Sequence, residues 1–163
     1  MDMRNVLLAV IVALWAPQVM AEAGIGGLSV AQTNRTVVGL ERSLAICAEV
    51  TPAYQMDCHA QSFRNAVVRL RNNPAYWEAE VAIHRISRNL RLFARHHSDP
   101  DAGRLKKASM RMRAVLKNKI AEGQNMQRME MEKAIQSMSD VSTQEARHFS
   151  LMINVIKHHL DTL

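Results

Sequence analysis

A chain of 163 residues with only 4% aromatic residues, six glycines and four prolines is poorly suited to a sandwich or barrel of many short strands. Ala, Leu, Met, Arg and Glu are abundant and favour helices, and the length suits one domain. The formal net charge of +6 favours partners that carry negative charge.

The first 21 residues have the features of a signal peptide. Arg4 precedes an unbroken apolar run over residues 6–15, Pro17 ends this run, and Ala21 stands where a signal peptidase would cleave. The run is shorter than the about 20 residues that a membrane-spanning helix needs, and no later stretch is long enough. We therefore expect cleavage after Ala21 and no transmembrane segment in the mature chain, with an uncleaved anchor as the alternative. The expected location is the periplasm, or else the extracellular space.

Export changes the meaning of the positive charge. Cleavage after Ala21 would remove one acidic residue, Asp2, and one basic residue, Arg4, so the mature chain keeps its net charge of +6. Nucleic acid is not an expected partner outside the cytoplasm, whereas anionic lipid headgroups, anionic envelope polymers and acidic proteins are. Solubility is the plainer explanation of the same charge.

The first half of the mature chain carries clear signals for helix starts. Residues 22–28 are rich in glycine and lack periodicity, which predicts a flexible start. Ser29 and Gln32 then match a capping box and predict the first helix. Pro52 and Pro74 predict the next two starts, because proline fits the first position of a helix. In each segment the apolar residues recur three and four positions apart, as in helix packing.

The two cysteines, Cys47 and Cys58, predict a disulfide. An even pair at short spacing in an exported chain is typical of a structural bridge. A metal site would normally add a CxxC motif or further ligands, and only His59 is adjacent. Closure of so short a loop contributes on the order of 3 kcal/mol to stability.

The segment 101–139 is predicted to form a fourth helix, with Asp99 as its cap. Its apolar face rotates near Gly123, so the helix is either continuous with a change of partners or kinked at that glycine. The apolar positions are Leu105, Ala108, Met112 and Val115, followed by Leu116, Ile120, Met131, Ile135 and Met138. Ser142 and Glu145 form a second capping box and open a last helix.

Helices joined by such short turns must run antiparallel to their neighbours. The sequence therefore predicts an all-α fold for residues 29–163: an antiparallel bundle of four to five helices with short, Pro-capped turns. The oligomeric state is left open.

Basic residues are concentrated between residues 85 and 119, where only Asp99 and Asp101 oppose them. On the third helix they lie opposite the apolar seam and so face solvent. We predict a cationic surface on the hairpin of helices three and four, which would bind an anionic envelope component or an acidic protein. An ordinary solvated helix face is the alternative. The candidate binding residues are Arg85, Arg88, Arg91, Arg95, Lys106, Lys107, Arg111 and Arg113.

Clustered methionines and paired histidines suggest a soft-metal site as the alternative. Met126 and Met129 share one helix face, and thioethers are suitable ligands for Cu(I). Methionine also fills cores and adaptable interfaces. The histidine pairs at 96–97 and 158–159 cannot chelate alone, because neighbours on a helix point about 100° apart. The competing function is thus a copper-type metal binder that uses Met126, Met129 and a histidine.

Enzyme chemistry finds the least support. The sequence contains no GxSxG, HExxH or Gly-rich phosphate motif, and no CxxCH for covalent haem. We assign no catalytic residue and no cofactor. The leading functional hypothesis is a non-enzymatic binding module of the cell envelope. The metal binder is the second hypothesis, and an enzyme is the third.

Overall fold

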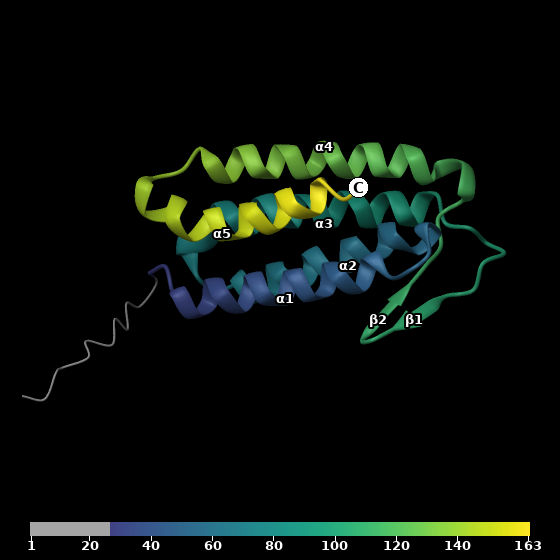
Figure 1. The fold of residues 1–163 in the computed structure, drawn as a ribbon, viewed down its shortest axis with the longest axis horizontal. Coiled ribbons are helices and arrows are strands. Elements are labelled where there is room, and N and C mark those ends of the chain that lie inside the picture. The colour runs from purple at the N-terminus through teal and green to yellow at the C-terminus, as the bar shows by residue number, and fades with distance from the viewer. Residues whose placement is uncertain (1–26) are drawn as a thin grey trace, which may run out of the picture.

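The computed structural model describes residues 27–163, so the signal peptide expected over residues 1–21 lies outside the described part. Five helices pack into a bundle: α1 (Val30–Ala48), α2 (Pro52–Leu70), α3 (Trp77–His96), α4 (Ile120–Ser139) and α5 (Thr143–Leu160). Consecutive helices run antiparallel, and α5 returns to pack against α1 (Figure 1). The predicted all-α antiparallel bundle is confirmed. No helix within the described range is long and apolar enough to cross a membrane.

The helix starts follow the local signals in the sequence. The Ser29 side chain accepts a hydrogen bond from the Gln32 backbone N–H, and Ser142 and Glu145 form a complete capping box. Pro52 occupies the first turn of α2, and Pro74 opens the short 3-10 helix η1 (Pro74–Tyr76) before α3. These caps satisfy backbone groups that a helix end leaves without partners.

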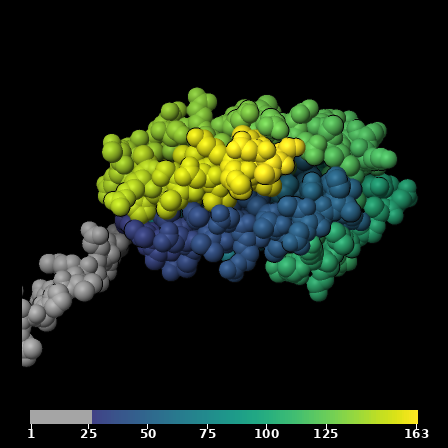
Figure 2. Space-filling model, viewed as in Figure 1, coloured from purple at the N-terminus to yellow at the C-terminus, as the bar shows by residue number. Residues whose placement is uncertain are grey.

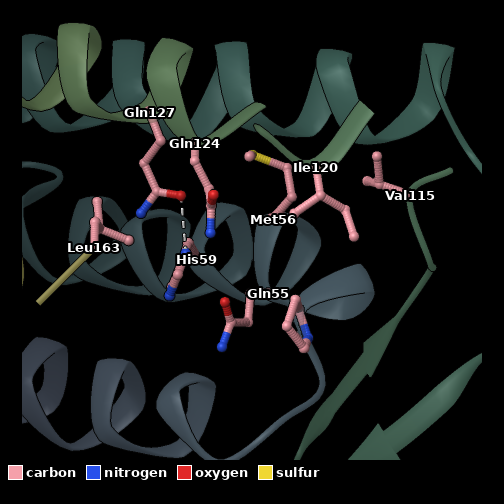
Figure 3. Close-up of a pocket in the computed structure, with 9 residues that line it drawn as sticks. Gln55, Met56, His59, Val115, Ile120, Gln124, Gln127 and Leu163 are labelled. Carbon is pink, nitrogen blue, oxygen red and sulfur yellow. Dashed lines mark hydrogen bonds between the residues drawn. The ribbon is translucent and has the colours of Figure 1, made fainter. Parts of the chain in front are cut away.

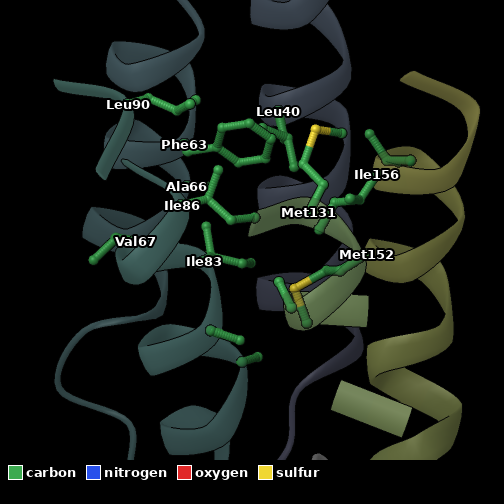
Figure 4. Packing of buried hydrophobic residues seen from close by; sticks show 14 of the residues in the cluster. Leu40, Phe63, Ala66, Val67, Ile83, Ile86, Leu90, Met131, Met152 and Ile156 are labelled. Carbon is green, nitrogen blue, oxygen red and sulfur yellow. The ribbon is translucent and has the colours of Figure 1, made fainter. Parts of the chain in front are cut away.

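The main core lies at the centre of the bundle and draws on all five helices (Figure 4). Burial of each large apolar side chain contributes roughly 1.5–3 kcal/mol, so this core supplies most of the driving force for folding. Fully buried members include Leu40, Phe63, Ile86, Met131 and Ile156. Leu28 packs against the same core, and the Gly27 carbonyl accepts a hydrogen bond from Asn73.

The prediction of a helix from residue 101 is wrong. The chain leaves α3 and forms an antiparallel hairpin of β1 (Leu105–Lys107) and β2 (Met110–Met112), and then a 3-10 turn η2 (Lys117–Lys119) leads into α4. The Asp99 side chain accepts a hydrogen bond from the Asp101 backbone N–H instead of capping a helix. The hairpin is anchored at the end of α3, because the backbone N–H of Leu116 donates to the carbonyl of His97.

The physical reason lies in the surface that the hairpin covers. Met110 and Met112 alternate with the exposed Arg111 and pack onto the Cys47–Cys58 pair in a second, smaller core. Burying two methionines there outweighs the good helix propensity of the segment. The alternation of apolar and basic residues over 110–114 is the period-two signal that the helical interpretation missed.

The predicted disulfide is present. Cys47, at the end of α1, is bonded to Cys58 in α2, and both residues are fully buried. The bridge therefore joins the first two helices directly beneath the hairpin, and it forms part of the floor on which Met110 and Met112 rest.

Gly123 does not mark a kink. It lies in the first turn of an uninterrupted α4, where a Cβ atom would stand 2.6 Å from Met56 Cε and 2.8 Å from Phe93 Cε1. The glycine is therefore needed for the close approach of α4 to α2 and α3.

We expect Gly123→Ala to lower the free energy of unfolding by about 1–2 kcal/mol, because overpacking outweighs the gain in helix propensity. The matched control is Gly39→Ala in α1, whose Cβ would lie nearest to the exposed Arg69 guanidinium, at 2.7 Å. That side chain can move, so the control should gain up to about 1 kcal/mol. Urea denaturation measures both variants, and equal gains would contradict the packing at Gly123.

Candidate functional site

Three residues of the predicted cationic surface lie on the outer face of α3. Arg88, Arg91 and Arg95 are exposed and recur three and four residues apart, opposite the buried positions of this helix. Within the described residues none of them has a carboxylate within ion-pair distance. These three guanidinium groups are therefore free to meet an external anion.

Two other members of the predicted set are neutralised by the fold itself. Arg85 Nε lies 3.5 Å from a carboxylate oxygen of Glu130, a side chain that is only 5% exposed and that also faces Lys133. Lys107 Nζ lies 2.7 Å from a carboxylate oxygen of Glu49, and its hydrogen bond and charge lower the pKa of Glu49. Arg85 thus attaches α3 to α4. Lys107 attaches the hairpin to the end of α1.

Arg113 also has a structural partner. Its backbone N–H donates to Asp57 Oδ2 at 2.9 Å, and its Nε lies 3.7 Å from the same oxygen. Asp57 is buried in α2, so an unpaired charge there would be unfavourable. The main contribution of Arg113 is to hold the end of the hairpin against α2.

The hairpin presents two cations directly opposite each other. Lys106 and Arg111 are cross-strand partners in the register of β1 and β2, and both are exposed. Like charges in opposite positions of an antiparallel pair repel each other and destabilise the pair. An anion bound over the hairpin would remove this repulsion.

We use the name cationic surface for two groups of exposed cations, Arg88, Arg91 and Arg95 on α3 and Lys106 and Arg111 on the hairpin. We expected the basic residues after α3 to lie on a fourth helix. They lie instead on the β-hairpin of β1 and β2, which corrects that expectation. The hairpin lies at the end of the bundle where α3 finishes, as Figures 1 and 2 show.

A buried histidine, paired with a glutamine, lies inside the bundle and was not predicted from the sequence. His59 of α2 is only 2% exposed, and its Nδ1 lies 3.0 Å from Oε1 of Gln127 in α4. Its other ring nitrogen, Nε2, is buried and has no hydrogen-bond partner in the described part of the chain. Burial and the charge of His159 lower the pKa of His59 to about 3, although the bond to Gln127 opposes this shift.

His159, on the last turn of α5, meets His59. The two ring centroids are 4.6 Å apart and the ring planes form an angle of 74°. The Nε2 atom of His159 is likewise buried without a partner among residues 27–163. Burial, followed by the charge of His158, lowers the pKa of His159. Both imidazoles are therefore uncharged near neutral pH.

His59 lines a small pocket between α2 and α4, to which Leu163 at the C-terminus also contributes (Figure 3). In the space-filling view the yellow α5 stops before the end of the bundle (Figure 2). The pocket has a volume of about 10 Å³ for the centre of a water-sized group, or room for about one such group. Its lining includes Gln55, Met56, His59, Gln124, Gln127 and Leu163.

The methionines of the predicted metal site lie in different surroundings. Met126 packs against the main core, whereas Met129 is 44% exposed. Of the histidine pairs, His96 and His158 are exposed and His97 stacks on Phe93. The described residues contain no group of three or more His, Cys, Asp or Glu side chains that could hold a metal.

The sequence does contain a signal for the buried histidine. His59 lies three residues after Met56 and four before Phe63, on the apolar face of α2. Gln127 likewise continues the stripe of Gly123 and Met131 on α4. A polar residue inside an apolar stripe is buried and needs a partner, so these two positions together indicate a buried polar pair.

Comparison of the chain with protein families, with curated proteins and with solved structures gave no match.

Proposed function

We propose that the protein is an exported, non-enzymatic binding module that attaches to an anionic component of the cell envelope through the cationic surface. The signal-peptide features of residues 1–21 support the location. The observation that carries the binding proposal is the pair Lys106 and Arg111, two exposed cations held opposite each other on a hairpin that is fixed to the bundle.

Solubility alone does not require such an arrangement. A soluble surface usually mixes charges of both signs, and mixing costs less than setting two cations against each other. Here Arg85, Lys107 and Arg113 each have a carboxylate partner, whereas the cations of the cationic surface have none among the described residues. Guanidinium groups also suit the task, because their planar fork matches phosphate and carboxylate oxygens.

The test is binding to phosphatidylglycerol vesicles and to polyglutamate, with phosphatidylcholine vesicles as the neutral surface. We expect the variant Arg88→Gln, Arg91→Gln and Arg95→Gln to bind the anionic vesicles roughly 100-fold more weakly, since each cation contributes about 1 kcal/mol near such a surface. Lys106→Gln with Arg111→Gln should lose about tenfold or more by the same reasoning. Binding by the wild type should weaken as salt rises, because the screening length falls to about 3 Å at 1 M.

A matched triple variant separates the surface from the net charge. Arg35, Arg42 and Arg128 are exposed arginines on α1 and α4, and their change to Gln removes the same three charges. This control should bind nearly as well as the wild type. Equal weakening of both triple variants, or no binding of the wild type to either anionic probe, would contradict the proposal.

A further inference from the structure

The outer face of α3 carries a line of exposed residues that begins with two apolar side chains. From Trp77 the positions advance by four, three, four, three and four residues, so on an ideal helix they stay within a sector of about 80°. At 1.5 Å per residue the line is about 27 Å long. We call it the α3 ridge, and its members are Trp77, Val81, His84, Arg88, Arg91 and Arg95.

The apolar end of the α3 ridge is an exposed patch. Trp77 is 62% exposed and Val81 is 46% exposed. Residues four apart are neighbours on a helix surface, so the two side chains form one patch and not two scattered positions. Neither belongs to the two hydrophobic cores of the described residues. Stability of the bundle therefore does not explain a tryptophan at this place.

The acidic residues near the α3 ridge do not neutralise it. Glu80, on the side of α3 that faces α2, is paired with Arg71 at 3.9 Å. On the other side Arg85 is paired with a buried carboxylate of α4. Glu78 lies about 100° around the helix from Trp77. It stands in the first turn, where a negative charge suits the helix N-terminus. The ridge thus combines an apolar patch at one end with cations towards the other.

We propose that the α3 ridge lies against the surface of an anionic phospholipid bilayer. Trp77 and Val81 would enter the headgroup region, and Arg88, Arg91 and Arg95 would bind the lipid phosphates. This inference rests on the proposed attachment to the envelope and names its partner. Tryptophan is enriched at membrane–water interfaces, where its ring is apolar and its N–H can meet water. The arginine fork matches phosphate oxygens, and its stem can lie along apolar surface.

Two features favour a bilayer over an acidic polymer or an acidic protein. A polymer such as polyglutamate could meet the arginines, but it offers no apolar medium for Trp77 and Val81. A stable protein interface takes about 20–30 residues on each side and seats its main side chains in pockets, whereas the ridge is one line along the outside of a single helix. A fluid bilayer needs no matching pocket, and apolar burial adds to charge attraction there.

Trp77 itself reports on the contact. Cleavage after Ala21 removes Trp15, so Trp77 is the one tryptophan in the sequence of the mature chain. With phosphatidylglycerol vesicles we expect its emission to shift to shorter wavelength. Phosphatidylglycerol that carries bromine on its acyl chains should quench this emission. Polyglutamate should cause neither change, and neutral phosphatidylcholine vesicles should cause little of either.

A double variant tests the apolar end of the α3 ridge. Trp77→Gln with Val81→Gln should bind phosphatidylglycerol vesicles at least about tenfold more weakly, because the apolar burial is lost. Its binding to polyglutamate should equal that of the wild type, and Trp77→Phe should retain most of the vesicle binding. The matched control is Val38→Gln with Leu151→Gln, which changes side chains that are 49% and 43% exposed on α1 and α5. This control should bind vesicles like the wild type, and circular dichroism checks the fold of each variant.

The outcomes separate this inference from the attachment on which it rests. Binding of the wild type to both anionic probes, without quenching of Trp77 by brominated lipid or without loss in the Trp77 and Val81 variant, would overturn the inference and leave the attachment standing. Binding to polyglutamate alone would also overturn it, in favour of an acidic polymer or protein. Equal weakening by the control pair would count against the ridge as the contact. Binding to neither probe would overturn both proposals.

Discussion

Acidification from pH 6.5 to pH 5 is expected to lower the free energy of unfolding by about 2 kcal/mol through His59 alone. In the folded chain burial and the charge of His159 lower the pKa of His59 to about 3, whereas the unfolded chain titrates near 6.5. Between these values the unfolded state binds a proton that the folded state does not, so stability falls with pH. The contribution is fully present above pH 6.5 and is lost progressively towards pH 3, in all roughly 4–5 kcal/mol.

Urea denaturation at a series of pH values measures this effect. The window between pH 6.5 and pH 5 is the informative one, because most carboxylates remain ionised there. The variant His59→Gln cannot titrate and should show a flatter dependence of stability on pH. His84→Gln, which changes an exposed histidine, should keep the wild-type slope. An NMR titration that placed the pKa of His59 near 6.5 in the folded chain would contradict this prediction.

Removal of the disulfide by Cys47→Ala with Cys58→Ala should cost about 3 kcal/mol of stability. The bridge closes a loop with a sequence separation of 11, and its loss returns that loop's entropy to the unfolded chain. The hairpin should loosen as well, because Met110 and Met112 pack on the buried cysteines. Amide hydrogen exchange over residues 105–112 should therefore rise more than exchange in the core of α3.

The control for this prediction is Lys107→Gln. The ion pair of Lys107 with Glu49 also attaches the hairpin, but it is largely exposed to solvent and should contribute less than about 1 kcal/mol. In the wild type, dithiothreitol without denaturant should leave the bridge intact, since both cysteines are fully buried. Rapid reduction under native conditions, or a double variant as stable as Lys107→Gln, would contradict the assigned role of the disulfide.

The helices of the bundle could be predicted because their signals are local. Ser29, Pro52 and the Ser142–Glu145 capping box act on the backbone within one turn of themselves. The apolar spacing of α3 identifies its buried face without knowledge of its partners, and so it also identified the exposed Arg88, Arg91 and Arg95. The two cysteines left a single possible pairing within the chain.

The hairpin could not be predicted from propensity, because Met, Arg, Lys and Ala all favour a helix. It forms because the disulfide between α1 and α2 offers an apolar surface that Met110 and Met112 cover only in an extended strand. The same contact decides which cations stay free, since Lys107 and Arg113 reach the carboxylates of Glu49 and Asp57 once the hairpin is in place.

The histidine pair depends still more on the tertiary structure. His59 and His159 come from α2 and α5, and no local rule relates residues so far apart in the chain. The sequence by itself therefore determined the helices, their buried faces, the disulfide and the region of positive charge, because these depend on nearest neighbours and on composition. Only the packing of α2, α4 and α5 decided which nitrogens are buried without partners, because burial and hydrogen-bond satisfaction are properties of the assembled bundle.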